Sequence, residues 1–91
     1  MKYEIERTLR FKKDYKLAKR RGCNMEKLKQ SIVMLANGEK LPKEYRDHSL
    51  TGDYTGYREC HVEPDWLLIY KTTEKYLILT LYRTGTHSNL F

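Results

Sequence analysis

The spacing of apolar residues changes once along this chain, and that change limits the folds it can adopt. Up to about residue 36, apolar side chains recur every three or four positions, which is the period of an amphipathic helix. From Tyr57 onward they alternate with polar residues or run continuously, which is typical of strands. Helices followed by consecutive strands predict an α+β fold, with the helices packed on one face of an antiparallel sheet.

The helical half predicts two helices after a short first strand at residues 2–6. The first helix runs from about Leu9 to Arg21, and the hydroxyl of Thr8 can cap its start. The second helix follows a possible cap at Asn24. The inward positions are apolar in both: Phe11, Tyr15 and Ala18 in the first, and Met25, Leu28, Ile32 and Leu35 in the second. Two helices joined by a tight turn form an αα-hairpin.

The second half predicts a meander of three antiparallel strands. Residues 57–62 alternate in character, residues 66–70 form the continuous apolar run of a central strand, and residues 76–82 form the last strand. Residues 41–56 are predicted to be an irregular connection with room for one short strand. With the first strand included, the sheet should contain about four strands.

Length and residue content indicate one small domain in a reducing compartment. Ninety-one residues leave little room for a second hydrophobic core. No stretch approaches the roughly 20 apolar residues of a membrane helix, and the first residues do not resemble an export signal. Cys23 and Cys60 form no C-x-x-C pair and are interpreted as ordinary thiols. We therefore expect a cytoplasmic protein with no membrane partner.

Positive charge is concentrated in the first half of the chain. Residues 1–46 contain 14 Lys and Arg against 6 Asp and Glu, whereas residues 47–91 contain 4 against 6. Such asymmetry predicts a polyanionic partner, nucleic acid before all else, or an acidic protein. The alternative is an ordinary solvated helix. The predicted electrostatic face for RNA or an antitoxin lies on the first helix and comprises Lys12, Lys13, Lys16, Lys19 and Arg20.

Three histidines lie in the second half of the chain, at His48, His61 and His87, beside predicted loops or strand ends. The meander can bring the turn at residues 63–65 close to the segment after the last strand. Converging imidazoles could supply the base and the acid for RNA cleavage by internal attack, because they titrate near neutral pH. Arg83 could hold the phosphate through paired N–H donors.

Other candidate residues surround this histidine group. Asp65 could orient a histidine or transfer a proton, and the rings of Trp66 and Phe91 could stack on an unpaired base. Trp66 has a competing interpretation as a core residue because it opens the most apolar strand. A zinc site across His61 and Asp65 is a further alternative, but no second close pair completes a tetrahedral ligand set. We therefore expect no metal and no other cofactor.

Four separated segments resemble, in order, the YafQ-type branch of the RelE/ParE toxin superfamily. They are residues 41–48, 50–52, 56–71 and 83–91. The resemblance is dense over residues 41–91 and only patterned over residues 1–40. It implies a single RelE-like toxin domain over residues 1–91.

The resemblance also implies an activity and partners. It implies the toxin of a type II toxin–antitoxin system, an endoribonuclease that inhibits translation by cutting messenger RNA in the ribosomal decoding site without a metal. Its expected partners are the ribosome, messenger RNA and a cognate DinJ-type antitoxin. Operator DNA is expected to be bound only through the antitoxin complex.

The same resemblance implies which residues form the active site. Five match the active-site positions of the family: His48, His61, Asp65, His87 and Phe91. Arg83 matches an arginine that contacts phosphate. Two alternatives stay open: a ParE-like toxin, which binds a protein target and needs no histidines, and a plain RNA- or protein-binding module, which leaves RNA uncut.

Overall fold

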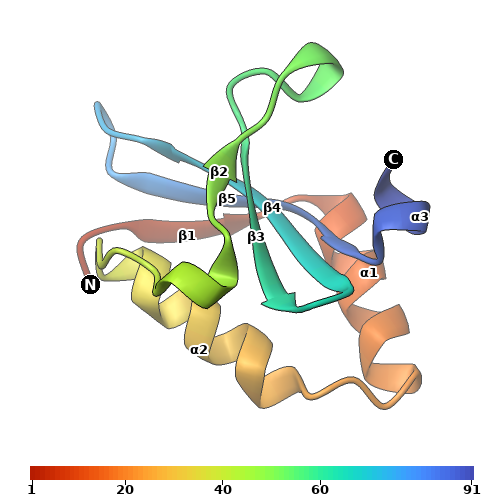
Figure 1. Ribbon diagram of the computed structural model, residues 1–91. Helices are drawn as coiled ribbons and strands as arrows, with labels where there is room; N and C mark the ends of the chain where they lie inside the picture. The colour runs from red at the N-terminus through yellow and green to blue at the C-terminus, as the bar shows by residue number, and fades with distance from the viewer.

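The computed structural model describes residues 1–91 as two long helices packed against a five-stranded sheet, with a one-turn helix at the end of the chain (Figure 1). The elements are β1 (Glu4–Arg7), α1 (Leu9–Arg20), α2 (Met25–Ala36), η1 (Lys43–Tyr45), β2 (His48–Ser49), η2 (Gly52–Tyr54), β3 (Arg58–Glu63), β4 (Trp66–Thr73), β5 (Ile78–Gly85) and α3 (His87–Leu90), where η marks a short 3₁₀ turn. The predicted α+β class and αα-hairpin are confirmed.

The sheet has the order β1-β5-β4-β3-β2, and one of its pairings is parallel. β3, β4 and β5 form the expected antiparallel meander. β1 runs parallel to β5, with Glu4 opposite Ile78. Parallel pairing requires a long connection between the strands, which the two helices and the meander supply. β2 is the fifth strand, and its two residues lie inside the predicted irregular connection.

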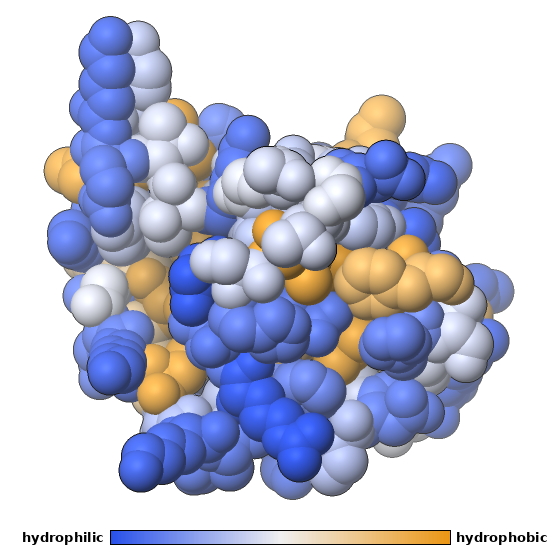
Figure 2. Space-filling model, turned by 45° about the horizontal axis from the view of Figure 1, so that its top comes forward, coloured by the Kyte–Doolittle hydropathy of each residue, from blue (hydrophilic) through white to orange (hydrophobic).

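The central strand β4 buries both of its faces, which explains its continuous apolar run. Leu68 and Tyr70 pack into the main core with residues of α1 and α2. Leu67 and Ile69 point to the opposite face, where they pack with Leu90 in a second, smaller cluster. We call this opposite side the open face, because α1 and α2 do not cover it. On the side of the molecule seen in Figure 2, hydrophilic side chains dominate and apolar atoms appear in patches between them.

The structure confirms one local prediction and corrects three others. Thr8 caps α1 as expected, since its Oγ1 accepts a hydrogen bond of 3.0 Å from the amide of Phe11. Asn24 precedes α2 but its side chain makes no capping hydrogen bond, so that prediction was wrong. Tyr15 is 38% exposed, because it lies at the edge of the inward stripe of α1. The last strand begins at Ile78, because the chain is still turning at Leu77, whose φ is 52°.

None of the helices has the length and apolar character needed to span a bilayer.

Ionisation of the buried Cys60 should weaken the fold at alkaline pH. Burial, helped by the charges of Asp47 and Glu59, raises the pKa of Cys60 from 9.0 to about 12. The unfolded chain therefore loses this proton first, so stability is fully present below pH 9.0 and is lost as pH rises toward 12. We expect up to about 1.4 kcal/mol of lost unfolding free energy per pH unit.

A Cys60→Ala variant provides the comparison. It should be less stable at neutral pH, because it leaves a cavity, but its stability should fall less steeply between about pH 8 and about pH 10.5. Urea denaturation at about pH 8 and at about pH 10.5 measures, for each protein, how far the free energy of unfolding falls as the pH rises. Parallel slopes for the variant and the wild type would contradict a raised pKa at Cys60.

Candidate active site

Three polar side chains of the open face come together on β2 and β3. Glu59 and His61 are two residues apart on β3, so strand alternation places them on the same face. The pairing of β2 with β3 sets His48 directly opposite Glu59. Across β3 and β4, Glu59 faces Ile69 and His61 faces Leu67, the two apolar residues that form the floor of the open face.

Glu59 lies between the two histidines. Its Oε1 is 3.5 Å from Nε2 of His48 and 3.7 Å from Nε2 of His61. The carboxylate is only 5% exposed, whereas His48 is exposed and His61 is half-buried. A buried carboxylate is unfavourable without partners, and these two imidazoles are its ionic partners when they are protonated.

The other ring nitrogen of each histidine faces a backbone carbonyl. Nδ1 of His48 lies 2.7 Å from the carbonyl oxygen of Arg46, and Nδ1 of His61 lies 3.3 Å from that of Pro64. A carbonyl can only accept, so Nδ1 carries a proton in each ring. Nε2 of each ring is then the nitrogen that can gain or release a proton at the open face.

Sequence reasoning did not single out Glu59. Its spacing was an available signal, because a glutamate two residues from a histidine on a strand shares the face of that histidine.

His87 and Phe91 form a second group at α3. His87 is the first residue of this helix, and its ring centroid lies 4.9 Å from that of Phe91. Both side chains are exposed, with Phe91 at 51%. Leu90, on the same helix, is buried in the smaller cluster and fixes the helix to the sheet.

Strand register relates the two groups to each other. Leu67 of β4 pairs with His61 on one side and with Gly85 of β5 on the other. Neighbouring strands are about 4.8 Å apart, so the Cα atoms of His61 and Gly85 are separated by roughly 10 Å. His87 follows Gly85 by two residues. The histidines thus border the same end of the sheet, although no hydrogen bond or ion pair joins His87 to His48, Glu59 or His61.

Asp65 lies in the exposed turn between β3 and β4 and forms no ion pair. Together with Thr86 and Asn89 it lines a cavity of about 400 Å³, whose other wall is formed by α1. The zinc alternative for His61 and Asp65 has no third ligand, since no group of three or more His, Cys, Asp or Glu is arranged around a common point.

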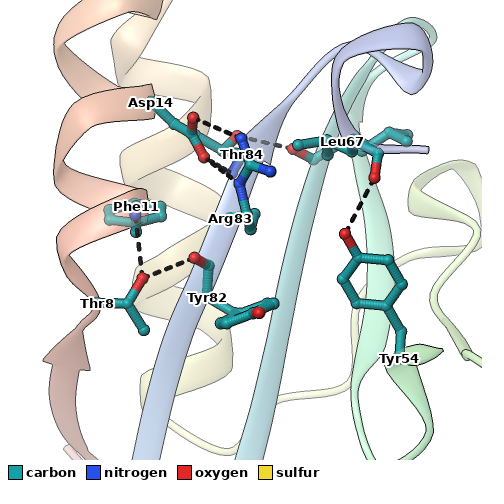
Figure 3. Close-up of polar contacts among 9 residues, drawn as sticks. Thr8, Phe11, Asp14, Tyr54, Leu67, Tyr82, Arg83 and Thr84 are labelled. Atoms are coloured by element: carbon teal, nitrogen blue, oxygen red, sulfur yellow. Dashed lines mark hydrogen bonds and ion pairs between the residues drawn. The ribbon is translucent and has the colours of Figure 1, made fainter.

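Arg83 is held by a residue of the basic helix. Its Nε and Nη2 donate to the two carboxylate oxygens of Asp14 at 2.9 and 3.0 Å, and the amide of Thr84 donates to the same carboxylate at 3.2 Å (Figure 3). The hydrogen bonds that Arg83 donates to Asp14 raise the pKa of Arg83 further, so it stays charged. Nη1 makes no hydrogen bond with the protein. Asp14 was not predicted, because it stands among lysines on α1.

The structure favours the core interpretation of Trp66. The residue is 6% exposed and packs in the main core with the helices, so it offers little ring surface to a base. Three other aromatic residues line the open face and were not singled out from the sequence: Tyr54, Tyr57 and Tyr82.

The predicted electrostatic face is available on the surface. All five of its residues are exposed along α1: Lys12, Lys13, Lys16, Lys19 and Arg20. None of the five lines the cavity beside Asp65, to which α1 contributes Asp14, Leu17, Ala18 and Arg21. The positive face therefore lies on another side of α1 than that cavity.

Comparisons with known proteins show what this chain is similar to. A family model described as "Bacterial toxin of type II toxin-antitoxin system, YafQ" matches residues 3–91. The mRNA interferase toxin YafQ of Escherichia coli K12 is 49% identical over 89 residues, which cover 97% of this chain and 95% of the relative.

Two solved structures have the same fold. The toxin in a crystal structure of the E. coli DinJ-YafQ toxin–antitoxin complex superposes with a TM-score of 0.89 at 47% identity, covering 100% of this chain and 99% of that one. A metal-bound toxin from Helicobacter pylori superposes with a TM-score of 0.92 at 37% identity, covering 98% and 99%.

Proposed function

This chain belongs to the YafQ family of bacterial toxins from type II toxin–antitoxin systems, and on that premise we propose that it is an mRNA interferase. It cuts messenger RNA on the translating ribosome and so stops translation. The observation that carries this proposal is the near-full-length similarity to the E. coli mRNA interferase YafQ. The chain also contains the groups needed for RNA cleavage: imidazoles, a carboxylate and a fixed guanidinium.

The proposed reaction is internal attack by the 2′-hydroxyl on the neighbouring phosphorus. The 2′-oxygen forms a new bond to phosphorus, the bond to the 5′-oxygen breaks, and a 2′,3′-cyclic phosphate and a 5′-hydroxyl result. One group takes the proton of the 2′-hydroxyl and another gives a proton to the leaving oxygen. His87, His61 and Asp65 share these transfers, and His48 supports them or positions the RNA.

In this scheme Arg83 and Phe91 contact the substrate. Nη1 of Arg83 stabilises the extra charge on the phosphorane, and the two hydrogen bonds that the guanidinium donates to Asp14 keep it in place. Phe91, half-exposed at the end of α3, stacks on a base or shapes the pocket. Glu59 orients Nε2 of His48 and His61 and balances their charge when they are protonated.

The same premise gives the partners. A cognate DinJ-type antitoxin neutralises the toxin, and operator DNA is bound only through that complex. The positive face on α1 binds either ribosomal RNA or acidic antitoxin residues, and its binding to RNA should weaken steeply with salt. We place the protein in the cytoplasm, where ribosomes and messages are found.

Cleavage of a defined message on translating ribosomes tests the proposal. Purified protein is treated with EDTA, freed of the chelator and incubated with stalled ribosomes in their magnesium buffer, and the ends of the fragments are mapped. We expect cuts within the decoding-site codon that leave cyclic phosphate ends and are unaffected by the EDTA treatment of the protein. An intact message with both treated and untreated protein would favour the ParE-like toxin that binds a protein target. Cuts by the treated protein only after a transition metal is restored would refute the metal-independent mechanism.

A further inference from the structure

One side chain fastens the loop between β2 and β3 to the C-terminal helix. Residues 51–56 are exposed except for Tyr54, which is half-buried. Its hydroxyl donates a hydrogen bond of 3.0 Å to the carbonyl oxygen of Leu90 in α3 (Figure 3). The remaining hydrogen bonds of the loop are local to residues 50–57. Tyr54 is therefore the loop's only hydrogen-bonded link to the rest of the protein.

The ring of Tyr54 continues this link into the aromatic residues that pack on the open face. Its centroid lies 5.2 Å from Phe91, edge to face, and 6.1 Å from Tyr82. Phe91 in turn packs on the ring of His87. Tyr57 and Tyr82 stack on each other at 4.6 Å. Because the tyrosine rings contact one another, they support neighbouring side chains more readily than they offer free faces to a base.

The helix α3 needs such support. It has four residues, and a single turn has too few internal hydrogen bonds to persist alone. At its start, Oγ1 of Thr86 accepts a hydrogen bond of 3.3 Å from the amide of Asn89. At its end the carbonyl of Leu90 has no partner within the helix, and the hydroxyl of Tyr54 fills that position.

We propose that Tyr54 is a positioning residue of the active site. By fastening the loop at residues 51–56 to α3, it holds His87 and Phe91 in the orientation that cleavage requires. Tyr54 itself does not transfer a proton. The inference rests on the proposed ribonuclease function and extends it to a loop that the histidine, aspartate and arginine chemistry does not include.

A Tyr54→Phe variant tests this role because it keeps the ring contacts and removes only the hydroxyl. Tyr57→Phe and Tyr82→Phe are matched controls, since their hydroxyls make no hydrogen bond with the protein. Two quantities are measured: kcat and KM for cleavage on ribosomes, and amide hydrogen exchange in residues 87–91. We expect Tyr54→Phe to lower kcat by about 3- to 10-fold with little change in KM, and to speed exchange in α3. Both controls should match the wild type.

The outcomes separate the inference from the function on which it rests. Wild-type kcat and unchanged exchange in Tyr54→Phe would overturn the positioning role while leaving the ribonuclease function intact. An equal fall in kcat for the two control variants would also overturn it, because the effect would then belong to the whole aromatic cluster. A wild-type protein that leaves RNA intact would overturn the function, and with it any role of Tyr54 in cleavage.

Discussion

Replacing His87 by alanine is expected to reduce the rate of message cleavage by about 10²- to 10⁴-fold, which is the usual loss when a proton-transfer group is removed. The side chain is exposed at the start of α3, so the fold should be retained. Cleavage rates on stalled ribosomes, with circular dichroism and a melting curve for each protein, measure both effects. A folded variant that cuts at the wild-type rate would refute the role of His87.

A second substitution separates proton transfer from packing. His87→Phe keeps an aromatic ring beside Phe91 but has no exchangeable proton, so it should be as inactive as His87→Ala. Recovery of activity in His87→Phe would show that the ring contact with Phe91, rather than the imidazole, is what cleavage needs.

Glu59→Gln tests the other histidine pair in the same assay. It keeps the size of the side chain and removes the charge that faces Nε2 of His48 and His61. We expect a smaller loss than for His87→Ala, together with a changed pH dependence of kcat, because Glu59 acts through the histidines. An unchanged pH profile would contradict this role.

The second large effect is expected at Asp14. Asp14→Ala removes the acceptor of three hydrogen bonds and leaves the mostly buried guanidinium of Arg83 without its counter-charge. We expect a loss of about 2 to 4 kcal/mol in the free energy of unfolding, because breaking a desolvated ion pair from one side strands the other charge. Urea denaturation near neutral pH measures it.

Two further variants identify the cause of that loss of stability. Asp53→Ala removes an exposed aspartate and should change the stability by less than about 0.5 kcal/mol. Arg83→Met with Asp14→Leu replaces the ion pair by apolar side chains and should recover much of the stability without restoring cleavage. A single Asp14→Ala variant as stable as Asp53→Ala would show that the pair contributes nothing to the fold.

The sequence alone determined which segments form helices and which form strands. The change from helical to strand periodicity correctly predicted α1, α2 and the meander, since periodicity reports which side of an element is buried. The continuous run at residues 66–70 correctly predicted the central strand, β4. The histidines and Arg83 were proposed from their chemistry and from the family resemblance, and their roles in cleavage stay predictions.

Only the tertiary structure decided which residues meet. The parallel pairing of β1 with β5, the position of Glu59 between His48 and His61, and the contact of Asp14 with Arg83 join residues that no local pattern links. The hydrogen bond from Tyr54 to Leu90 spans a sequence separation of 36 residues. Such contacts depend on strand register and on how the helices cross the sheet, and neither is encoded in the spacing of apolar residues within one element.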